Sequence, residues 1–169
     1  REAVEEEKLG RIMNGTARIL WRRDDNYYKQ APWRGTWDLD GGTLMNQCIH
    51  NIDLMQWMIG SEVERVYAEC DTYRNNIEGE DFGAILVRFK NGAIGIIEGS
   101  AVVYPKNLEE TLSIFGTQGT VVIGGLAVNE LKTWRFEGED EEAVKAGLQV
   151  EIDSVYGEGH TPLIRDVIY

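Results

Sequence analysis

Residues 41–57 read GGTLMNQCIHNIDLMQW, and their pattern predicts a helix from about Thr43 to Ile59 that ends at Gly60. Apolar residues recur every three or four positions, the spacing that places them on one side of a helix. This apolar side consists of Leu44, Cys48, Ile52, Met55 and Ile59. We expect it to pack on a β-sheet, because a helix with one apolar stripe must bury it against another element.

The opposite side of this helix carries Asn46, His50, Asp53 and Trp57 and has almost no charge. A solvated helix face in an acidic protein normally carries several Lys and Glu residues. One interpretation is that His50 and Asp53, spaced i to i+3, form a hydrogen-bonded pair on the surface. The other is that the stripe faces a cleft or another domain, where an imidazole can move a proton and a carboxylate can orient it. The absence of Lys and Glu favours the second, and the absence of a second His nearby argues against a metal site.

The remainder of the chain predicts one α+β domain over residues 1–169. Alternating patterns predict strands at 11–21, 63–73, 82–89 and 93–103, and Asn91-Gly92 favours a tight antiparallel hairpin between the last two. In the 63–73 strand, Val66, Ala68 and Cys70 share one face, as in a half-buried strand. Further strands are expected at 112–115, 120–123, 126–136 and 149–155, an ordered loop at 27–40, an acidic loop near 137–147 and a final helix from Pro162. The predicted architecture is an open, largely antiparallel sheet with helices on one face.

Composition narrows the class of protein. The chain has 169 residues and a formal net charge of -12, which argues against nucleic acid and anionic membrane as partners. Two cysteines without metal-ligand spacing suggest reduced thiols, and no apolar run approaches the roughly 18 residues of a membrane span. A cytoplasmic protein is therefore expected. Locally, residues 11–37 hold six basic and two acidic residues, which favours an anionic ligand there.

Several motifs resemble the Gfo/Idh/MocA oxidoreductases, which are NAD(P)-dependent enzymes acting mainly on sugars and cyclitols. They are KLGRI at 8–12, GTWDLDGGTLMNQCIHNIDLMQWMIG at 35–60, EDFGAILVRFKNGAIGIIEGS at 80–100 and GHTPLIRDVI at 159–168. The family combines an N-terminal Rossmann domain with a C-terminal α+β domain whose open sheet commonly builds the oligomer interface. The chain resembles that second domain alone.

The resemblance implies that NAD or NADP is bound mainly by a missing N-terminal domain. The sequence lacks the G-x-G-x-x-G fingerprint and the family's E-K-P lysine, starts without Met and ends within a helical pattern. We therefore expect a domain excised from a longer, homo-oligomeric enzyme, inactive by itself and with no confident cofactor-binding residue of its own.

Within the motif GG-x-L-x-x-x-x-x-H-x-x-D, His50 matches the family histidine beside the reacting sugar carbon and is the candidate acid/base residue. Asn46 occupies a position where many members have Asp, and an amide cannot accept a proton. It would instead bind a sugar hydroxyl or position His50. Asp53 is expected either to contact substrate or to orient its neighbours.

The loop YYKQAPWRGTWDLDGG resembles most closely a branch that acts on nucleotide-linked N-acetylated sugar uronates. The resemblance implies that Tyr28, Trp33 and Trp37 stack on sugar faces, while Arg22 or Arg34 meets a carboxylate or phosphate. The alternative interpretation is that these aromatic residues only anchor the loop to the sheet. Two alternative functions remain: a non-catalytic carbohydrate-binding or scaffold module of the same fold, and a reductase of the biliverdin reductase or dihydrodiol dehydrogenase type.

Overall fold

The computed structural model describes residues 1–125, 128–148 and 164–167. In chain order the elements are α1 (Glu2–Glu5), β1 (Ile12–Leu20), α2 (Asp25–Lys29), α3 (Gly42–Asn46), α4 (Ile49–Ile59), β2 (Val63–Asp71), β3 (Phe82–Phe89), β4 (Ile94–Ser100), β5 (Glu109–Gly116), β6 (Gly119–Gly124), β7 (Glu130–Phe136) and α5 (Glu141–Leu148). Residues 164–167 form a helical turn inside the predicted final helix. The strand expected at 149–155 lies outside the described residues, as does His160.

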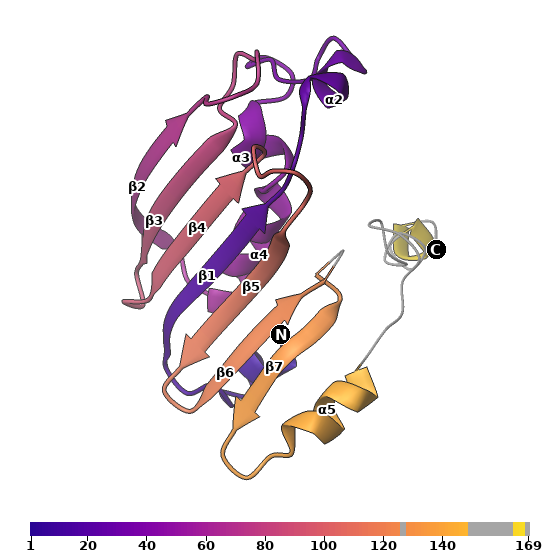
Figure 1. Cartoon of the computed structure of the whole chain (residues 1–169). Coiled ribbons are helices and arrows are strands. Elements are labelled where there is room, and N and C mark those ends of the chain that lie inside the picture. Colours follow the sequence, from indigo (N-terminus) through magenta and orange to yellow (C-terminus); the bar gives the residue numbers. More distant parts are fainter. Residues whose placement is uncertain (126–127, 149–163, 168–169) are drawn as a thin grey trace.

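The strands form one sheet in the order β2-β3-β4-β1-β5-β6-β7. Every neighbouring pair is antiparallel except β1 and β4, which run parallel. Helices α3 and α4 cover one face, and none of the labelled helices covers the face turned toward the viewer in Figure 1. The predicted fold class, an open and largely antiparallel sheet with helices on one face, is confirmed.

The core lies between α4 and the middle of the sheet. Cys48, Met55 and Ile59 of the helical segment are buried, as the apolar stripe predicts, and they meet buried residues of the central strands. Two glycines of β4 permit this close approach, because a Cβ on Gly95 would lie 2.8 Å from the Met55 sulfur and one on Gly99 2.6 Å from the Cys48 sulfur. Burial of each such apolar side chain contributes roughly 1.5–3 kcal/mol to stability.

The single helix expected over 43–59 is wrong in one respect, because it is divided into α3 and α4. The N–H groups of Gln47 and Cys48 both donate to the Thr43 carbonyl, at 2.9 and 3.1 Å. The N–H groups of Asn51 and Ile52 then both donate to the Cys48 carbonyl. Apolar periodicity is nearly unchanged across such a break, so the sequence pattern did not reveal it.

The half-buried strand expected at 63–73 is also wrong, because every residue of β2 is exposed. Val66 and Tyr67, which point to opposite faces, are 54% and 63% exposed. β2 is the outermost strand, and the helices lie over its inner neighbours. Alternation of apolar and polar residues indicates which side chains share a face of a strand. Whether a helix covers that face is decided by the tertiary structure.

The predicted hairpin between β3 and β4 is confirmed, with a different turn. Only Gly92 has a positive φ, +89°, while Asn91 accepts a hydrogen bond from the Ala93 N–H. Two other departures concern helices: α2 covers residues 27–29 of the expected 27–40 loop, and α5 replaces most of the expected acidic loop.

Candidate functional site

The paired glycines of the opening motif set the direction of α3. Gly41 and Gly42 both have positive φ values, +76° and +83°, which residues other than glycine rarely adopt. They bring the start of α3 against Glu80, whose Oε1 accepts from the Leu44 N–H at 2.7 Å and whose carbonyl accepts from the Thr43 N–H at 2.9 Å. A Cβ on Gly42 would lie 2.0 Å from Glu80 Oε2. The buried carboxylate thus caps α3 and fixes where the residues after it lie.

The polar stripe predicted from the sequence is present on the outer face of α4. His50, Asp53 and Trp57 are exposed in this domain. Among the described residues, neither a hydrogen bond nor an ion pair joins His50 to Asp53. Both side chains are therefore available to a ligand or a neighbouring domain.

Asn46 lies at the end of α3 and is held by the preceding loop. Its amide N–H donates to the Asp40 carboxylate, and its carbonyl accepts from the Gln47 amide. Gln47 also donates to the Tyr27 hydroxyl at 3.0 Å. This chain of polar contacts joins the helix break to the aromatic loop, so Asn46 positions both segments.

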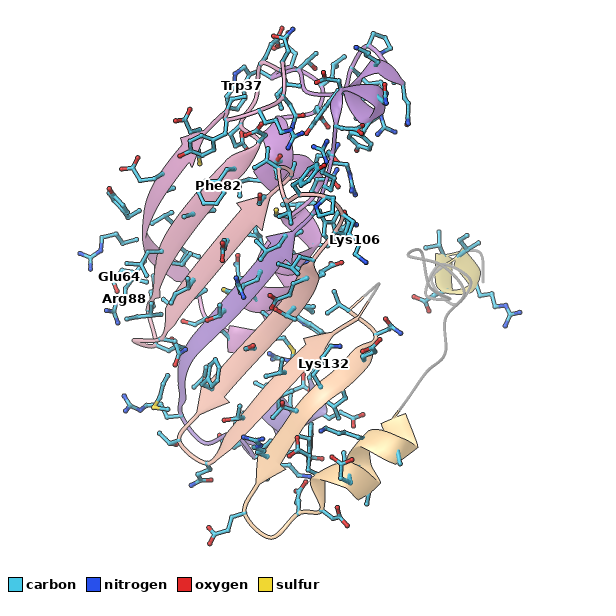
Figure 2. All side chains as sticks on the ribbon, in the orientation of Figure 1. Trp37, Glu64, Phe82, Arg88, Lys106 and Lys132 are labelled. Atoms are coloured by element: carbon cyan, nitrogen blue, oxygen red, sulfur yellow. The ribbon has the colours of Figure 1, made fainter. Side chains whose placement is uncertain are left out.

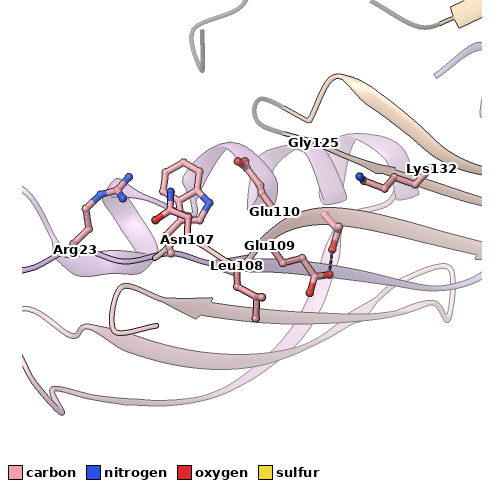
Figure 3. Close-up of a pocket in the computed structure, with 9 residues that line it drawn as sticks. Arg23, Asn107, Leu108, Glu109, Glu110, Gly125 and Lys132 are labelled. Carbon is pink, nitrogen blue, oxygen red and sulfur yellow. Dashed lines mark hydrogen bonds between the residues drawn. The ribbon is translucent and has the colours of Figure 1, made fainter. Parts of the chain in front are cut away.

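A cavity of about 360 Å³ opens where β1 ends and β5 begins. Its walls include Trp21, Arg23, Asn107, Glu110 and Lys132. In the view of Figure 3, Arg23 and Lys132 lie at opposite ends with Glu110 between them. A negative group flanked by two positive ones gives the cavity a strongly polar wall.

Glu110 connects this cavity to the helix stripe. Asn51, the buried neighbour of His50 on α4, donates from its amide to Glu110 Oε1 at 2.8 Å. Partial burial raises the pKa of Glu110, against the opposing effects of the Asn51 hydrogen bond and of the charges on His50 and Arg23. Asn51 thus brings α4 against the cavity wall, and His50 is the preceding residue of the same helix, on its exposed side.

The aromatic side chains of the 27–40 loop differ in their exposure to solvent. Trp37 is 62% exposed at the end of the sheet where α2 and α3 lie, and Trp33 is also exposed (Figure 2). Tyr28 is half-buried, and loss of solvation raises its pKa to about 12. Trp37 is thus the most open of the three to a ligand, Trp33 is exposed but lies under the Arg34 guanidinium, and Tyr28 packs within the loop.

The arginines of this region fall into two groups. Arg22 donates to the Arg23 carbonyl at 3.1 Å and lies 4.0 Å from the Asp24 carboxylate, so its guanidinium is already engaged. Arg34 and Arg23 both lie over the ring of Tyr27, at 3.9 and 5.0 Å from its centroid.

None of the nine residues that line the cavity is a site residue predicted from the sequence, and Trp21, Arg23 and Glu110 are among them. Trp21 and Arg23 continue β1 with period two, a signal that was available in the sequence. Glu110 is brought here because Ile19 pairs with it across β1 and β5, and only the strand register reveals that contact.

Residues 1–122 match the profile of the family described as GFO/IDH/MocA C-terminal domain. The chain belongs to this family. Its match to the myo-inositol 2-dehydrogenase of Thermotoga maritima is 30% identical over 88 residues, covering 49% of this chain and 26% of that protein. Its match to the levoglucosan dehydrogenase of Pseudarthrobacter phenanthrenivorans is 25% identical over 158 residues, covering 78% of this chain and 40% of that protein.

Two solved structures are more similar in sequence to this chain than the two proteins above. The WlbA dehydrogenase from Bordetella pertussis, in complex with NADH and UDP-GlcNAcA, is 42% identical with a TM-score of 0.78, over 82% of this chain and 42% of that one. The Chromobacterium violaceum WlbA dehydrogenase, in complex with the same two molecules, is 38% identical with a TM-score of 0.83, over 99% of this chain and 46% of that one. This GFO/IDH/MocA domain thus spans less than half the length of the relatives it matches.

The described residues do not fit a dinucleotide by themselves. No described strand leads through a G-x-G-x-x-G turn into a helix, so this part of the chain has no cradle of backbone N–H groups for a pyrophosphate. The described residues also contain no group of three His, Cys, Asp or Glu side chains placed to hold a metal. In the same part of the chain, no helix is long and apolar enough to cross a membrane.

Proposed function

We propose that this chain is the substrate-binding domain of an NAD(P)-dependent oxidoreductase that oxidises a hydroxyl of a sugar or nucleotide-linked sugar. The observation that carries the proposal is the exposed position of His50 on a nearly uncharged helix stripe, next to Asn51, which donates to Glu110 in the wall of the 360 Å³ cavity. The sugar dehydrogenases among the family relatives support it.

The nicotinamide cofactor, NAD or NADP, is proposed to be held by an N-terminal Rossmann domain of the same protein. When bound, it would supply the acceptor for the hydride that leaves the sugar carbon. The exposed stripe of α4, with His50, Asp53 and Trp57, is the surface that would close against that domain. Closure would exclude water from the imidazole and strengthen its electrostatic interactions.

Residues of this chain would then transfer the proton and position and bind the substrate. His50 takes or returns the proton of the reacting hydroxyl, together with a lysine from the other domain. Asn46 holds the loop to the helix, and Asp53 orients groups on the stripe. Trp33 and Trp37 form the aromatic side of the substrate site, with the half-buried Tyr28 packed behind them in the loop, and basic side chains of residues 22–34 meet the anionic part of the substrate.

For the substrate, we propose a nucleotide-linked sugar uronate. The local excess of basic residues in 11–37 favours an anionic ligand, and both WlbA structures contain UDP-GlcNAcA. The whole protein is further proposed to be a cytoplasmic homo-oligomer associated through the open face of its sheet, without nucleic acid or membrane as a partner.

A non-catalytic carbohydrate-binding or scaffold module is the second candidate. It is favoured by one observation, the full engagement of the Asn46 amide by Asp40 and Gln47 where many family members carry an acid. Such a module would bind sugar nucleotides without reducing NAD.

The test is the variant His50→Asn in the protein encoded by the complete reading frame. Turnover, followed by nicotinamide absorbance with sugar nucleotides, should fall by roughly 100-fold or more, because general acid/base catalysis contributes about 10²–10⁴-fold. The melting temperature should hardly change, since His50 is exposed. Gln56→Ala, an exposed change on the same helix, serves as the control and should retain full rate. A wild type that binds sugar nucleotides but never reduces NAD would favour the module, and full activity in His50→Asn would remove the acid/base assignment.

A further inference from the structure

Five side chains, of which Trp21 and Arg23 line the cavity, alternate between aromatic rings and guanidinium groups. Arg23 lies 4.6 Å from the ring centroid of Trp21 and 5.0 Å from that of Tyr27. Arg34 lies 3.9 Å from the Tyr27 ring and 5.2 Å from the Trp33 ring. The resulting order, Trp21, Arg23, Tyr27, Arg34 and Trp33, is called the guanidinium ladder below.

Both guanidinium groups of the ladder carry buried donors that have no partner. Arg23 Nε, Arg34 Nε and Arg34 Nη1 are inaccessible to solvent and make no hydrogen bond. Within the described residues, the Arg34 side chain makes no hydrogen bond or ion pair at all, and Arg23 makes one hydrogen bond, from Nη1 to the Arg22 carbonyl at 2.9 Å. Buried polar groups are nearly always hydrogen-bonded in folded proteins, so three orphaned donors on two neighbouring side chains require an explanation.

Other arginines of this chain show what a structural guanidinium looks like. Arg18, on the open face of the sheet, bridges Glu98 at 3.0 Å and Glu109 at 2.8 Å. Arg22 uses a carbonyl and the Asp24 carboxylate. Arginines elsewhere in this chain thus find acceptors for their guanidinium groups. The unpaired donors of Arg23 and Arg34 are not explained by packing alone.

Within the described residues, no carboxylate forms an ion pair with either guanidinium of the ladder. Asp24 caps α2 by accepting from the Tyr27 N–H at 3.1 Å, and Glu110 accepts from Asn51 while its charge also acts on Arg23. Arg23 and Arg34 both lie over the Tyr27 ring, so their positive charges repel each other. An anion bound beside them would reduce this repulsion and supply acceptors for guanidinium donors.

We propose that the guanidinium ladder is the anion subsite of the substrate cavity, in which Arg23 and Arg34 bind a carboxylate or phosphate group of the substrate. This inference rests on the proposed function for the identity of the cavity and adds Arg23 and the ladder geometry to it. Arg23 lines the cavity wall directly. A planar guanidinium pairs with two oxygens of such an anion at once, and stacking on aromatic rings fixes its plane beforehand.

Equilibrium binding tests the subsite without requiring catalysis. Isothermal titration calorimetry on the protein from the complete reading frame would compare UDP-glucuronic acid, which carries a carboxylate and phosphates, with UDP-glucose, which carries phosphates alone. The variants are Arg23→Gln and Arg34→Gln, and the control is Arg65→Gln, an exposed arginine on the outermost strand β2 and outside the cavity wall. Each ladder variant should weaken at least one ligand by about 10-fold or more, and the control by less than about 3-fold.

The pattern of losses identifies the bound group. Equal weakening of both ligands assigns the ladder to phosphate, and weakening of UDP-glucuronic acid alone assigns it to the carboxylate. Unchanged affinity for both ligands in folded ladder variants overturns the proposal, as does a wild type that binds neither ligand.

Thermal unfolding separates this role from a structural one. A ladder variant that binds normally but melts well below the wild type indicates packing only, and overturns the proposal. If Arg34→Gln does not fold, Arg34→Lys keeps the charge and should still lose affinity several-fold, because an ammonium lacks the bidentate fork. Retained binding without NAD reduction would sink the dehydrogenase proposal and leave the anion subsite standing.

Discussion

At the scale of single residues, the start of α3 depends on the close contact between Glu80 and Gly42. Gly42 combines a φ of +83° with a contact that leaves no room for a Cβ. The Glu80 carboxylate occupies that room and caps α3. The position of His50 therefore depends on a glycine that never touches it.

The variant Gly42→Ala should lower the free energy of unfolding by about 3 kcal/mol. Roughly 1–2 kcal/mol comes from placing a side chain in the left-handed region, and about 1 kcal/mol or more from displacing the cap. Gly138→Ala is the matched control, because Gly138 has nearly the same φ, +80°, with nothing within 4 Å of a new Cβ. It should cost only the backbone contribution. Urea unfolding of both variants measures the difference, and equal losses would show that the contact with Glu80 is unimportant.

At the scale of elements, α5 is attached to the edge strand β7 mainly through one carboxylate. Glu141 accepts from the Trp134 N–H at 3.1 Å, from Arg135 at 3.3 Å and from Lys145 at 3.0 Å. These interactions, with Lys145 contributing most, lower the pKa of Glu141 from its ordinary value to about 2. A carboxylate whose pKa is lower in the folded state stabilises the fold above its unfolded pKa, near 4.5, and loses that effect as the pH falls toward 2.

The variant Glu141→Gln should therefore be less stable than the wild type at pH 7, by the same margin down to about pH 5. The difference should narrow below pH 4.5 and vanish near pH 2, where the wild-type carboxyl is protonated as well. Melting temperatures across this range give the measurement, with Glu137→Gln, an exposed change in the same connection, as control. A margin independent of pH would mean that Glu141 acts through packing and not through its charge.

At the scale of the whole molecule, the two faces of the sheet differ in what covers them. On the face without helices, Tyr67, Leu86 and Ile96 stand in register across β2, β3 and β4, with 63%, 49% and 44% of each exposed. Figure 2 places Phe82 and Arg88 of β3 at the two ends of this region. Exposed apolar residues in a contiguous row commonly mark an association surface.

If the proposed homo-oligomer uses this face, Leu86→Lys combined with Ile96→Lys should weaken association by at least about 10-fold, or roughly 1.4 kcal/mol. The monomer should remain folded, because both side chains are exposed. Val66→Lys is the matched control, since Val66 is equally exposed on the opposite face of β2. Sedimentation velocity of the complete protein gives the oligomeric state. Dissociation by Val66→Lys alone would place the interface on the other face.

The amino-acid sequence by itself determined the apolar stripe of the α3–α4 segment, the β3–β4 hairpin and the nearly uncharged face that carries His50. These features depend on residue spacing and backbone freedom within short stretches of the chain. Only the tertiary structure decided the break at Gln47–Cys48, the exposure of β2 and the meeting of Arg23 with Glu110 in one cavity wall. Those depend on strand register and on what covers each surface, because residues about 90 positions apart become neighbours only when β1 pairs with β5.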